Sequence, residues 1–178
     1  MNRKRRISML VMVGVALLLA SSTLHAKNPL VMKGNSWTYN NEIMGDKPSE
    51  QWDTQQNNEL ARPVKWVLHK SGGNPVIWLI YDDTVSKWTT ASIASDLQKS
   101  YQARGINPDA VQQMTINTND VYIIGGTDPV KNVRYNTAVF WRVGTKRAYN
   151  IELTAPTNEF STYEPAYKGM LQTIKLLP

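Results

Sequence analysis

Alternating apolar and polar residues predict β-strands along much of the chain. In residues 64–69, the apolar side chains of Val64, Trp66 and Leu68 share one face of a strand. Residues 76–81 are apolar on both faces, as in a central strand that is covered on each side. These two segments are expected to pair as a hairpin. Further strands are predicted at residues 110–117, 120–124, 133–143 and 148–154.

The strands at 133–143 and 148–154 form the clearest predicted hairpin. Both alternate regularly, so one face is expected to be core and the other largely polar. Residues 144–146 supply the turn between them. Just upstream, Gly125 and Gly126 are expected to end the preceding strand, because glycine permits turn conformations that other residues avoid.

A helical spacing of apolar residues predicts a first helix at residues 90–104. Ile93, Leu97 and Tyr101 recur at every fourth position there and form one narrow apolar stripe. Gly105 is suited to close this helix, because glycine readily adopts the left-handed conformation of a helix end.

A second helix is predicted at residues 162–174, where an apolar stripe begins at Tyr163. Ser161 and Glu164 have the spacing of a capping box, which satisfies the free N–H groups at a helix start. There are no internal repeats and there is no domain-scale linker. The order of elements therefore predicts a single α+β domain with a mainly antiparallel β-sheet packed by at least two helices.

The first 60 residues differ from this pattern. Residues 1–26 combine a basic start, an apolar run and a small-residue exit that ends at Ala26, and this combination is typical of a secretory signal peptide. The apolar run is shorter than the roughly 20 residues that a permanent membrane span needs. The mature domain is expected at residues 27–178. Its segment 27–60 is predicted to be largely irregular, with one short hairpin around residues 36–43.

Charge and composition narrow the classes of function. The chain carries 20 basic and 14 acidic residues, but the signal peptide contributes four basic residues and no acidic one. The mature protein is close to neutral, so no nucleic-acid partner is expected. The chain has no cysteine and two histidines, which excludes disulfides, thiolate metal sites and thiol nucleophiles. No cofactor and no metal are predicted, and no transmembrane segment is expected after signal cleavage.

Two segments near the carboxyl terminus carry a resemblance to a known family. They are AYNIELTAP at residues 148–156 and, after Phe160, YKGMLQTIKL at residues 167–176. This order of strand, small-residue turn, helix and short apolar end resembles the PsbP-like family, which includes extrinsic subunits of photosystem II and a nuclear-transport relative that binds the Ran GTPase. The resemblance implies an α/β/α sandwich and an assembly, binding or accessory role. It carries over no site residue.

The densest basic group of the mature chain lies around the predicted hairpin. By alternation, Phe140 stands between Arg134 and Arg142 on one strand face, and Arg147 follows the turn. An exposed phenylalanine flanked by arginines suits an anionic partner, such as an acidic protein surface or a phosphorylated lipid. Arg134, Phe140, Arg142 and Arg147 are therefore the predicted partner-binding residues. A solvated strand face, or a Phe140 covered by a helix, is the alternative interpretation.

Three polar features have simpler interpretations than a catalytic site. His69 is the only histidine after residue 26, and it is expected on the surface without the further ligands that a zinc site needs. Asp82 and Asp83 follow a buried strand, where carboxylates bind calcium or act as acid and base. Adjacent strand residues point to opposite faces, so these two are expected to shape a solvated turn.

The six tryptophans raise the question of carbohydrate binding through aromatic platforms. Alternation assigns three of them, Trp66, Trp78 and Trp141, to the core. The other three are Trp37, Trp52 and Trp88. They lie in less regular segments, where an exposed side chain would be available to a sugar.

Together these features predict an exported protein, periplasmic or secreted, that is a non-enzymatic binding or accessory protein of PsbP-like type. It is expected to recognise a protein partner through its sheet or hairpin surface. One alternative is a secreted carboxylate-based or metal-assisted hydrolase that uses Asp82 or Asp83. The other is an extracellular carbohydrate or lipid binding module, for which an anionic lipid or a glycan is the ligand.

Overall fold

Antiparallel strands in two sheets form the framework of the molecule. The computed structural model describes residues 30–57, 61–69, 74–82, 85–141 and 147–178. The smaller sheet contains β1 (Val31–Lys33), β2 (Ser36–Tyr39), β3 (Ile43–Asp46) and β12 (Lys175–Leu176). The larger sheet contains β4 (Trp52–Gln56), β5 (Val64–Leu68), β6 (Val76–Asp82), β7 (Asn107–Pro108), β8 (Gln112–Ile116), β9 (Asn119–Asp128), β10 (Val133–Trp141) and β11 (Ala148–Pro156).

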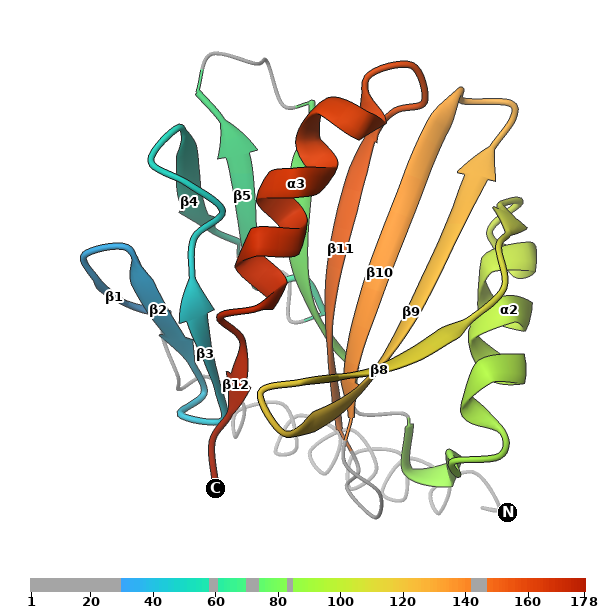
Figure 1. Cartoon of the computed structure of the whole chain (residues 1–178), viewed down its shortest axis with the longest axis horizontal. Coiled ribbons are helices and arrows are strands. Elements are labelled where there is room, and N and C mark those ends of the chain that lie inside the picture. Colours follow the sequence, from blue (N-terminus) through green and yellow to red (C-terminus); the bar gives the residue numbers. More distant parts are fainter. Residues whose placement is uncertain (1–29, 58–60, 70–73, 83–84, 142–146) are drawn as a thin grey trace, which may run out of the picture.

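The order of strands brings distant parts of the chain together. The smaller sheet has the order β1-β2-β3-β12, and the larger sheet has the order β4-β5-β6-β11-β10-β9-β7, with β8 paired to β9 (Figure 1). The predicted hairpin of β5 and β6 is confirmed, with Lys65 opposite Trp78. The strands β10 and β11 pair from Val133 opposite Pro156 to Trp141 opposite Ala148, as the alternation predicts.

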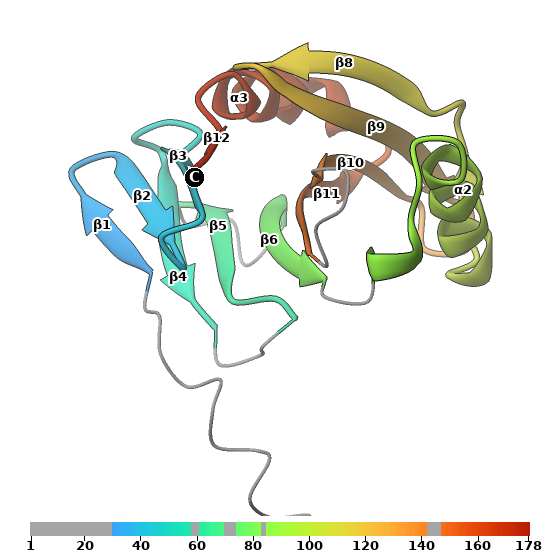
Figure 2. The same ribbon diagram turned by 90° about the horizontal axis from the view of Figure 1, so that it is seen from below.

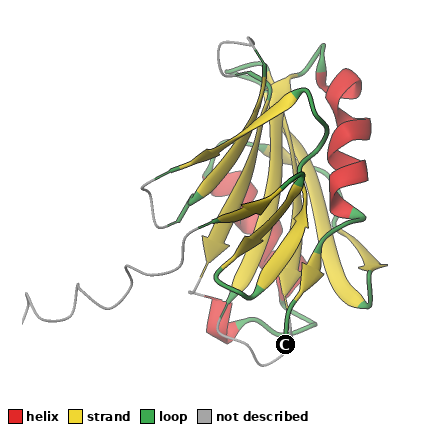
Figure 3. Cartoon of the chain, turned by 90° about the vertical axis from the view of Figure 1, so that its left-hand side faces the viewer, coloured by secondary structure: helices red, strands yellow, loops and turns green. Residues whose placement is uncertain are grey.

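Two α-helices cover opposite faces of the larger sheet, on either side of β9 (Figure 2). On one face, α3 (Phe160–Leu171) packs Tyr167, Met170 and Leu171 against the core. Figure 3 shows that this helix runs along the strands. On the other face, α2 (Ile93–Ala103) packs its predicted stripe of Ile93, Leu97 and Tyr101 against β9 and β10. A short 3-10 helix, η1 (Val85–Lys87), precedes α2. The mainly antiparallel α+β fold is therefore confirmed.

The start of α3 differs from the prediction. The helix begins at Phe160 and its N-cap residue is Glu159, without a side-chain capping hydrogen bond. Ser161 therefore lies inside the helix, and the predicted capping box is wrong. The reason is tertiary packing, because Phe160 is buried in the core and its burial sets the first helical turn.

The segment 27–60 is more regular than its composition predicts. Its described part contains β1 to β4, and its aromatic and aliphatic residues Trp37, Ile43 and Trp52 are buried in the core. The predicted short hairpin is confirmed as β2 and β3. The segment beyond this hairpin is not irregular, because β3 pairs with β12 at the other end of the chain and β4 pairs with β5. Such nonlocal partners leave no local sequence pattern.

Gly125 and Gly126 lie inside β9, so the prediction that they end a strand is wrong. A Cβ atom on Gly126 would lie 2.7 Å from the Asn107 carbonyl oxygen, and one on Gly125 would meet the Asp109 carboxylate. Glycine is required at Gly126 because the backbone of the paired strand β7 lies too close for a side chain there.

The second half of β10, from Thr137 to Trp141, is buried on both faces, so the expectation of a largely polar face is wrong there. Ala138 and Phe140 belong to the core on the α3 side, and Val139 and Trp141 belong to the core on the α2 side. Within the described segments, no helix has the length and apolar character that crossing a membrane requires.

Candidate binding surfaces

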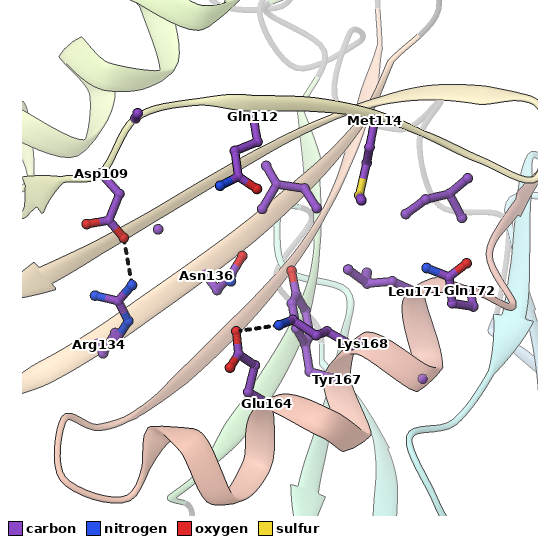
Figure 4. Close-up of a pocket in the computed structure, with 15 residues that line it drawn as sticks. Asp109, Gln112, Met114, Arg134, Asn136, Glu164, Tyr167, Lys168, Leu171 and Gln172 are labelled. Carbon is purple, nitrogen blue, oxygen red and sulfur yellow. Dashed lines mark hydrogen bonds and ion pairs between the residues drawn. The ribbon is translucent and has the colours of Figure 1, made fainter.

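A groove lies on the α3 side of the larger sheet, where β8 curls toward the helix (Figure 4). Its volume is about 540 Å³. One wall is β8, whose Gln112, Met114 and Ile116 share a strand face, and the opposite wall is α3. The floor is formed by β9 and β10, which contribute Ile123 and Asn136 among others. The groove therefore combines three consecutive strands with a helix that lies further along the chain.

The outer part of the groove carries two ion pairs. Arg134 Nη2 lies 2.6 Å from Asp109 Oδ2, and Lys168 Nζ lies 3.0 Å from Glu164 Oε1. The Arg134 guanidinium also lies over the ring of Phe160. Figure 4 shows both pairs on the same side of the groove, away from Met114. We name these four charged residues, Asp109, Arg134, Glu164 and Lys168, the rim.

The other end of the groove is lined mainly by apolar residues. Met114, Ile116, Ile123 and Leu171 line it. Beyond them, Asn117 Nδ2 donates to the carbonyl oxygens of Gln172 and Ile174 at 2.6 and 3.0 Å, which ties the β8–β9 turn to the end of α3. The groove thus runs from a charged rim to an apolar end.

A second candidate surface lies on the opposite face of the same sheet. The residues of this face on β6 are Trp78 and Ile80, and neither belongs to the core on either side of the sheet. The Arg62 guanidinium carbon lies 5.3 Å and Lys65 Nζ 5.7 Å from the centroid of the Trp78 ring. Asn150, opposite Ile80, has a shielded Oδ1 without a hydrogen-bond partner among the described residues. We name these five half-buried residues the sheet patch.

The predicted partner-binding residues are not brought together. Arg134 pairs with Ala155 near one end of the β10–β11 hairpin, and Arg147 directly precedes Ala148 at the other end. Arg134 contributes to the rim. Arg147 forms an ion pair with Glu42, which also accepts a hydrogen bond from Tyr149. Burial and this carboxylate raise the pKa of the Tyr149 hydroxyl above its usual value.

Phe140 is completely buried, so an exposed phenylalanine between two arginines is wrong, and the alternative in which a helix covers Phe140 is confirmed. Its strand face is covered by α3 and β8, which two-residue alternation within β10 cannot reveal. Arg142 lies outside the described residues. The binding role of the four predicted residues stays a prediction.

The simple interpretation of His69 agrees with its surroundings. His69 Nδ1 lies 2.8 Å from Asp53 Oδ2, and Nε2 lies 2.8 Å from the Glu50 carbonyl oxygen. The hydrogen bond with Asp53, followed by that with Glu50, raises the pKa of the imidazole. Asp82 lies at the end of β6, and Asp83 lies outside the described residues. Within the segments that the structure describes, no group of three or more potential metal ligands is found.

Trp66 and Trp141 are buried in the core as predicted, but other tryptophans are placed differently from the prediction. Trp37 and Trp52, expected to be available to a sugar, are buried in the core, and Trp88 packs edge-on against Trp141. Trp78, expected in the core, is half-buried on the sheet patch. Because Arg62 and Lys65 already occupy positions over its ring, stacking of a sugar on Trp78 would require their displacement.

A buried charge network joins α2 to the sheet, and the sequence patterns did not indicate it. Glu152 is 2% exposed and accepts hydrogen bonds from Arg104 Nη1 at 2.9 Å and from Thr137 Oγ1 at 3.0 Å. Tyr101 Oη lies 2.7 Å from Thr137 Oγ1. Burial raises the pKa of the Tyr101 hydroxyl, and the negative charge of Glu152 nearby raises it further. We assign this network to structure, because its groups are satisfied by one another.

Two local signals for the groove were present in the sequence. A pair of glycines inside a strand indicates close approach by another segment, and here the Asp109 N–H donates to the Gly125 carbonyl oxygen at 2.8 Å. Glu164 and Lys168 have the i, i+4 spacing of a helical ion pair. Neither signal tells which elements face each other, so the groove itself required the tertiary structure.

The arrangement of a mainly antiparallel sheet between two helices is a PsbP-like α+β fold. Cyanobacterial PsbP (CyanoP) from Synechocystis sp. PCC 6803 is similar to this chain with a TM-score of 0.59 and 9% identity. The similarity covers 89% of this chain and 99% of that protein.

A second solved structure shares the fold. LpqN, a protein involved in cell envelope biogenesis of Mycobacterium tuberculosis, is similar with a TM-score of 0.59 and 15% identity, over 76% of this chain and 83% of LpqN. No family model and no curated protein matches the chain by sequence. The expected resemblance to PsbP-like proteins is therefore confirmed at the level of the fold.

Proposed function

We propose that the chain is an exported, non-enzymatic accessory protein that recognises an acidic protein partner through the sheet patch. The observation that carries this proposal is the arrangement of Arg62 and Lys65 around the half-buried ring of Trp78. Tryptophan and arginine are the residues most enriched where protein interfaces gain their binding energy. The patch thus has the composition of a binding hot spot on an open sheet face.

Charge complementarity supports an acidic partner. Among the described residues, neither Arg62 nor Lys65 forms an ion pair with a carboxylate, whereas Arg104, Arg134 and Arg147 each do. Acidic side chains of a partner would find two unneutralised cations beside an apolar ring. Asn150 Oδ1 offers an additional acceptor for a partner N–H. The predicted arginines at the hairpin ends are a weaker choice, because two of them already have carboxylate partners.

Partner capture tests the proposal. The variant R62E/K65E reverses both charges, and K87E/K99E reverses two exposed lysines elsewhere as a control of equal net charge. The tagged proteins are exported, crosslinked before extraction and compared by quantitative mass spectrometry. A partner with an acidic surface should be retained by the wild type and the control and reduced about tenfold or more in R62E/K65E. Equal capture by all three proteins, or no captured protein, would overturn the proposal.

Export is tested separately at the amino terminus. The signal-peptide pattern predicts that the exported protein begins at Lys27. An exported location agrees with the envelope role of LpqN, which has the same fold. Mass spectrometry of the protein recovered from the periplasm and the medium measures its first residue. Recovery of the uncleaved chain in the cytoplasm alone would contradict this part of the proposal.

A further inference from the structure

The groove on the α3 side suits a ligand of different chemistry from the sheet patch. We propose that it binds a single-chain amphipathic lipid with a zwitterionic head group that carries hydrogen-bond donors. The apolar chain lies against Met114, Ile116 and Leu171, and the head group lies at the rim. This site is on the opposite face of the sheet from the proposed partner surface.

The apolar end of the groove provides a place for the hydrocarbon chain of the lipid. Met114 is 41% exposed although it lines the groove, so a large apolar side chain faces open space. Methionine is unbranched and polarisable, which lets it adapt to a flexible ligand. Burial of a hydrocarbon chain here would remove apolar surface of both molecules from water, and this is favourable.

The size of the groove favours a small ligand over a protein surface. A volume of about 540 Å³ lies within the range of small-molecule sites, which is about 300–1,000 Å³. A stable protein interface buries about 800 Å² on each partner over a broad area. The hydrogen bonds from Asn117 to the end of α3 hold the β8–β9 turn against the helix beside the apolar end of the groove.

The charges of the rim define the head group. The two cations, Arg134 and Lys168, are each paired with a carboxylate, so the rim has no net charge. A purely anionic head would approach Asp109 and Glu164 as closely as it approaches the two cations. A zwitterionic head can place its anionic part near Arg134 and Lys168 and its cationic part near the carboxylates. The rim therefore favours a zwitterion over an anion with the same chain.

The floor of the groove adds a requirement for a donor. Asn136 Oδ1 is shielded from solvent and has no hydrogen-bond partner among the described residues. A buried acceptor without a partner is costly, and a ligand donor that reaches it recovers the lost hydrogen bond. A primary ammonium group supplies such a donor and carries the cationic charge that the rim carboxylates favour.

Methionine methyl NMR on residues 27–178 tests this inference. This part of the chain contains four methionines, Met32, Met44, Met114 and Met170, and only Met114 lines the groove. The probes are lysophosphatidylethanolamine and lysophosphatidic acid, each with a lauroyl chain and each below its micelle concentration. We expect saturable shifts of the Met114 methyl signal while Met32 and Met44 stay in place. The zwitterionic probe should bind several-fold more tightly than the anionic one.

Two adjacent glutamines provide a matched pair of variants. Gln112 and Gln113 are both exposed on β8, but only Gln112 lines the groove. Q112W should fill the groove and weaken binding of the zwitterionic probe about tenfold or more, whereas Q113W should bind like the wild type. Unchanged Met32 and Met44 signals in Q112W show that the fold is retained.

The outcomes separate this inference from the proposed function. An unshifted Met114 signal with both probes, or equal binding by Q112W and Q113W, would overturn the groove as a lipid site. Equal or tighter binding of lysophosphatidic acid would overturn the zwitterionic head group. A Met114 shift with a leucine-rich peptide and not with either lipid would also overturn it, in favour of a protein segment. The variant R62E/K65E should bind the zwitterionic probe normally, whatever its effect on partner capture.

Discussion

The buried pair of Arg104 and Glu152 allows a quantitative test of how α2 is held on the sheet. Glu152 is 2% exposed, and its charge is stabilised by Arg104 and by Thr137. Replacement of Arg104 by methionine keeps much of the side-chain volume but leaves the Glu152 charge with one neutral donor. Breaking a buried ion pair in this way costs about 3–5 kcal/mol.

The lower end of that range is expected for R104M. The Arg104 side chain is 35% exposed, so water can reach part of the vacated space and solvate the carboxylate. Arg104 also lies over the rings of Tyr101 and Tyr135, and each such contact contributes about 0.5–1 kcal/mol at exposed sites. We therefore expect a loss of about 3 kcal/mol in the free energy of unfolding.

The reverse substitution and the double variant complete the cycle. E152M leaves an arginine that can turn toward solvent, so its expected cost is smaller, about 1–2 kcal/mol. R104M/E152M removes both charges and should lie within about 1–2 kcal/mol of the wild type, because apolar replacement of a whole buried pair is often nearly neutral. Urea unfolding at neutral pH, with equal m values, measures all four proteins. A cost below about 1 kcal/mol for R104M, or a double variant no more stable than R104M, would refute this reasoning.

Two further predictions concern glycine positions and His69. Gly126→Ala should destabilise the protein by about 1–3 kcal/mol, because its Cβ would meet the Asn107 carbonyl oxygen. Gly169→Ala, with open space around its Cβ in α3, should stabilise the protein by about 0.5–1 kcal/mol. Urea unfolding measures both variants; an unchanged stability of Gly126→Ala, or a destabilised Gly169→Ala, would contradict the respective prediction. The pKa of His69 is raised in the folded protein, so its bond to Asp53 stabilises the fold fully below about pH 6.5. This stabilisation is lost as the pH rises through the folded-state pKa of His69. NMR titration should show a lower pKa in D53N, and an unchanged value would exclude the Asp53 contact.

Strong periodicity in the sequence predicted most of the central elements. Two kinds of periodicity are visible in the sequence because a strand turns every second side chain toward the core and a helix roughly every fourth. They are the alternation in β5, β10 and β11 and the helical stripe of Ile93, Leu97 and Tyr101. The same patterns predicted an α+β fold, and the segments at residues 148–156 and 167–176 indicated its PsbP-like type. Elements of this kind depend mainly on local spacing, so a single sequence contains the necessary information.

The surfaces that can bind a partner were not accessible to the same reasoning. Whether Phe140 or Trp78 is exposed depends on where α3 and α2 lie over the sheet, and each helix covers only part of its face. Alternation along one strand distinguishes its two faces but does not say which face remains uncovered. This is why Phe140 was expected at the surface and Trp78 in the core.

The amino-acid sequence alone defines the helical and strand periodicity, the absence of thiol chemistry, the near-neutral charge after residue 26 and the resemblance to a PsbP-like fold. Only the folded structure shows that Asp109, Arg134, Glu164 and Lys168 meet at one rim, and that Arg62 and Lys65 flank Trp78. It also decided that Glu152 is buried with its counter-ion. The rim and the pair of Arg104 and Glu152 join segments that are far apart in the chain, so their meeting depends on nonlocal strand pairing and on helix packing. Arg62, Lys65 and Trp78 lie in or next to one predicted hairpin, but whether a helix covers them depends on tertiary packing.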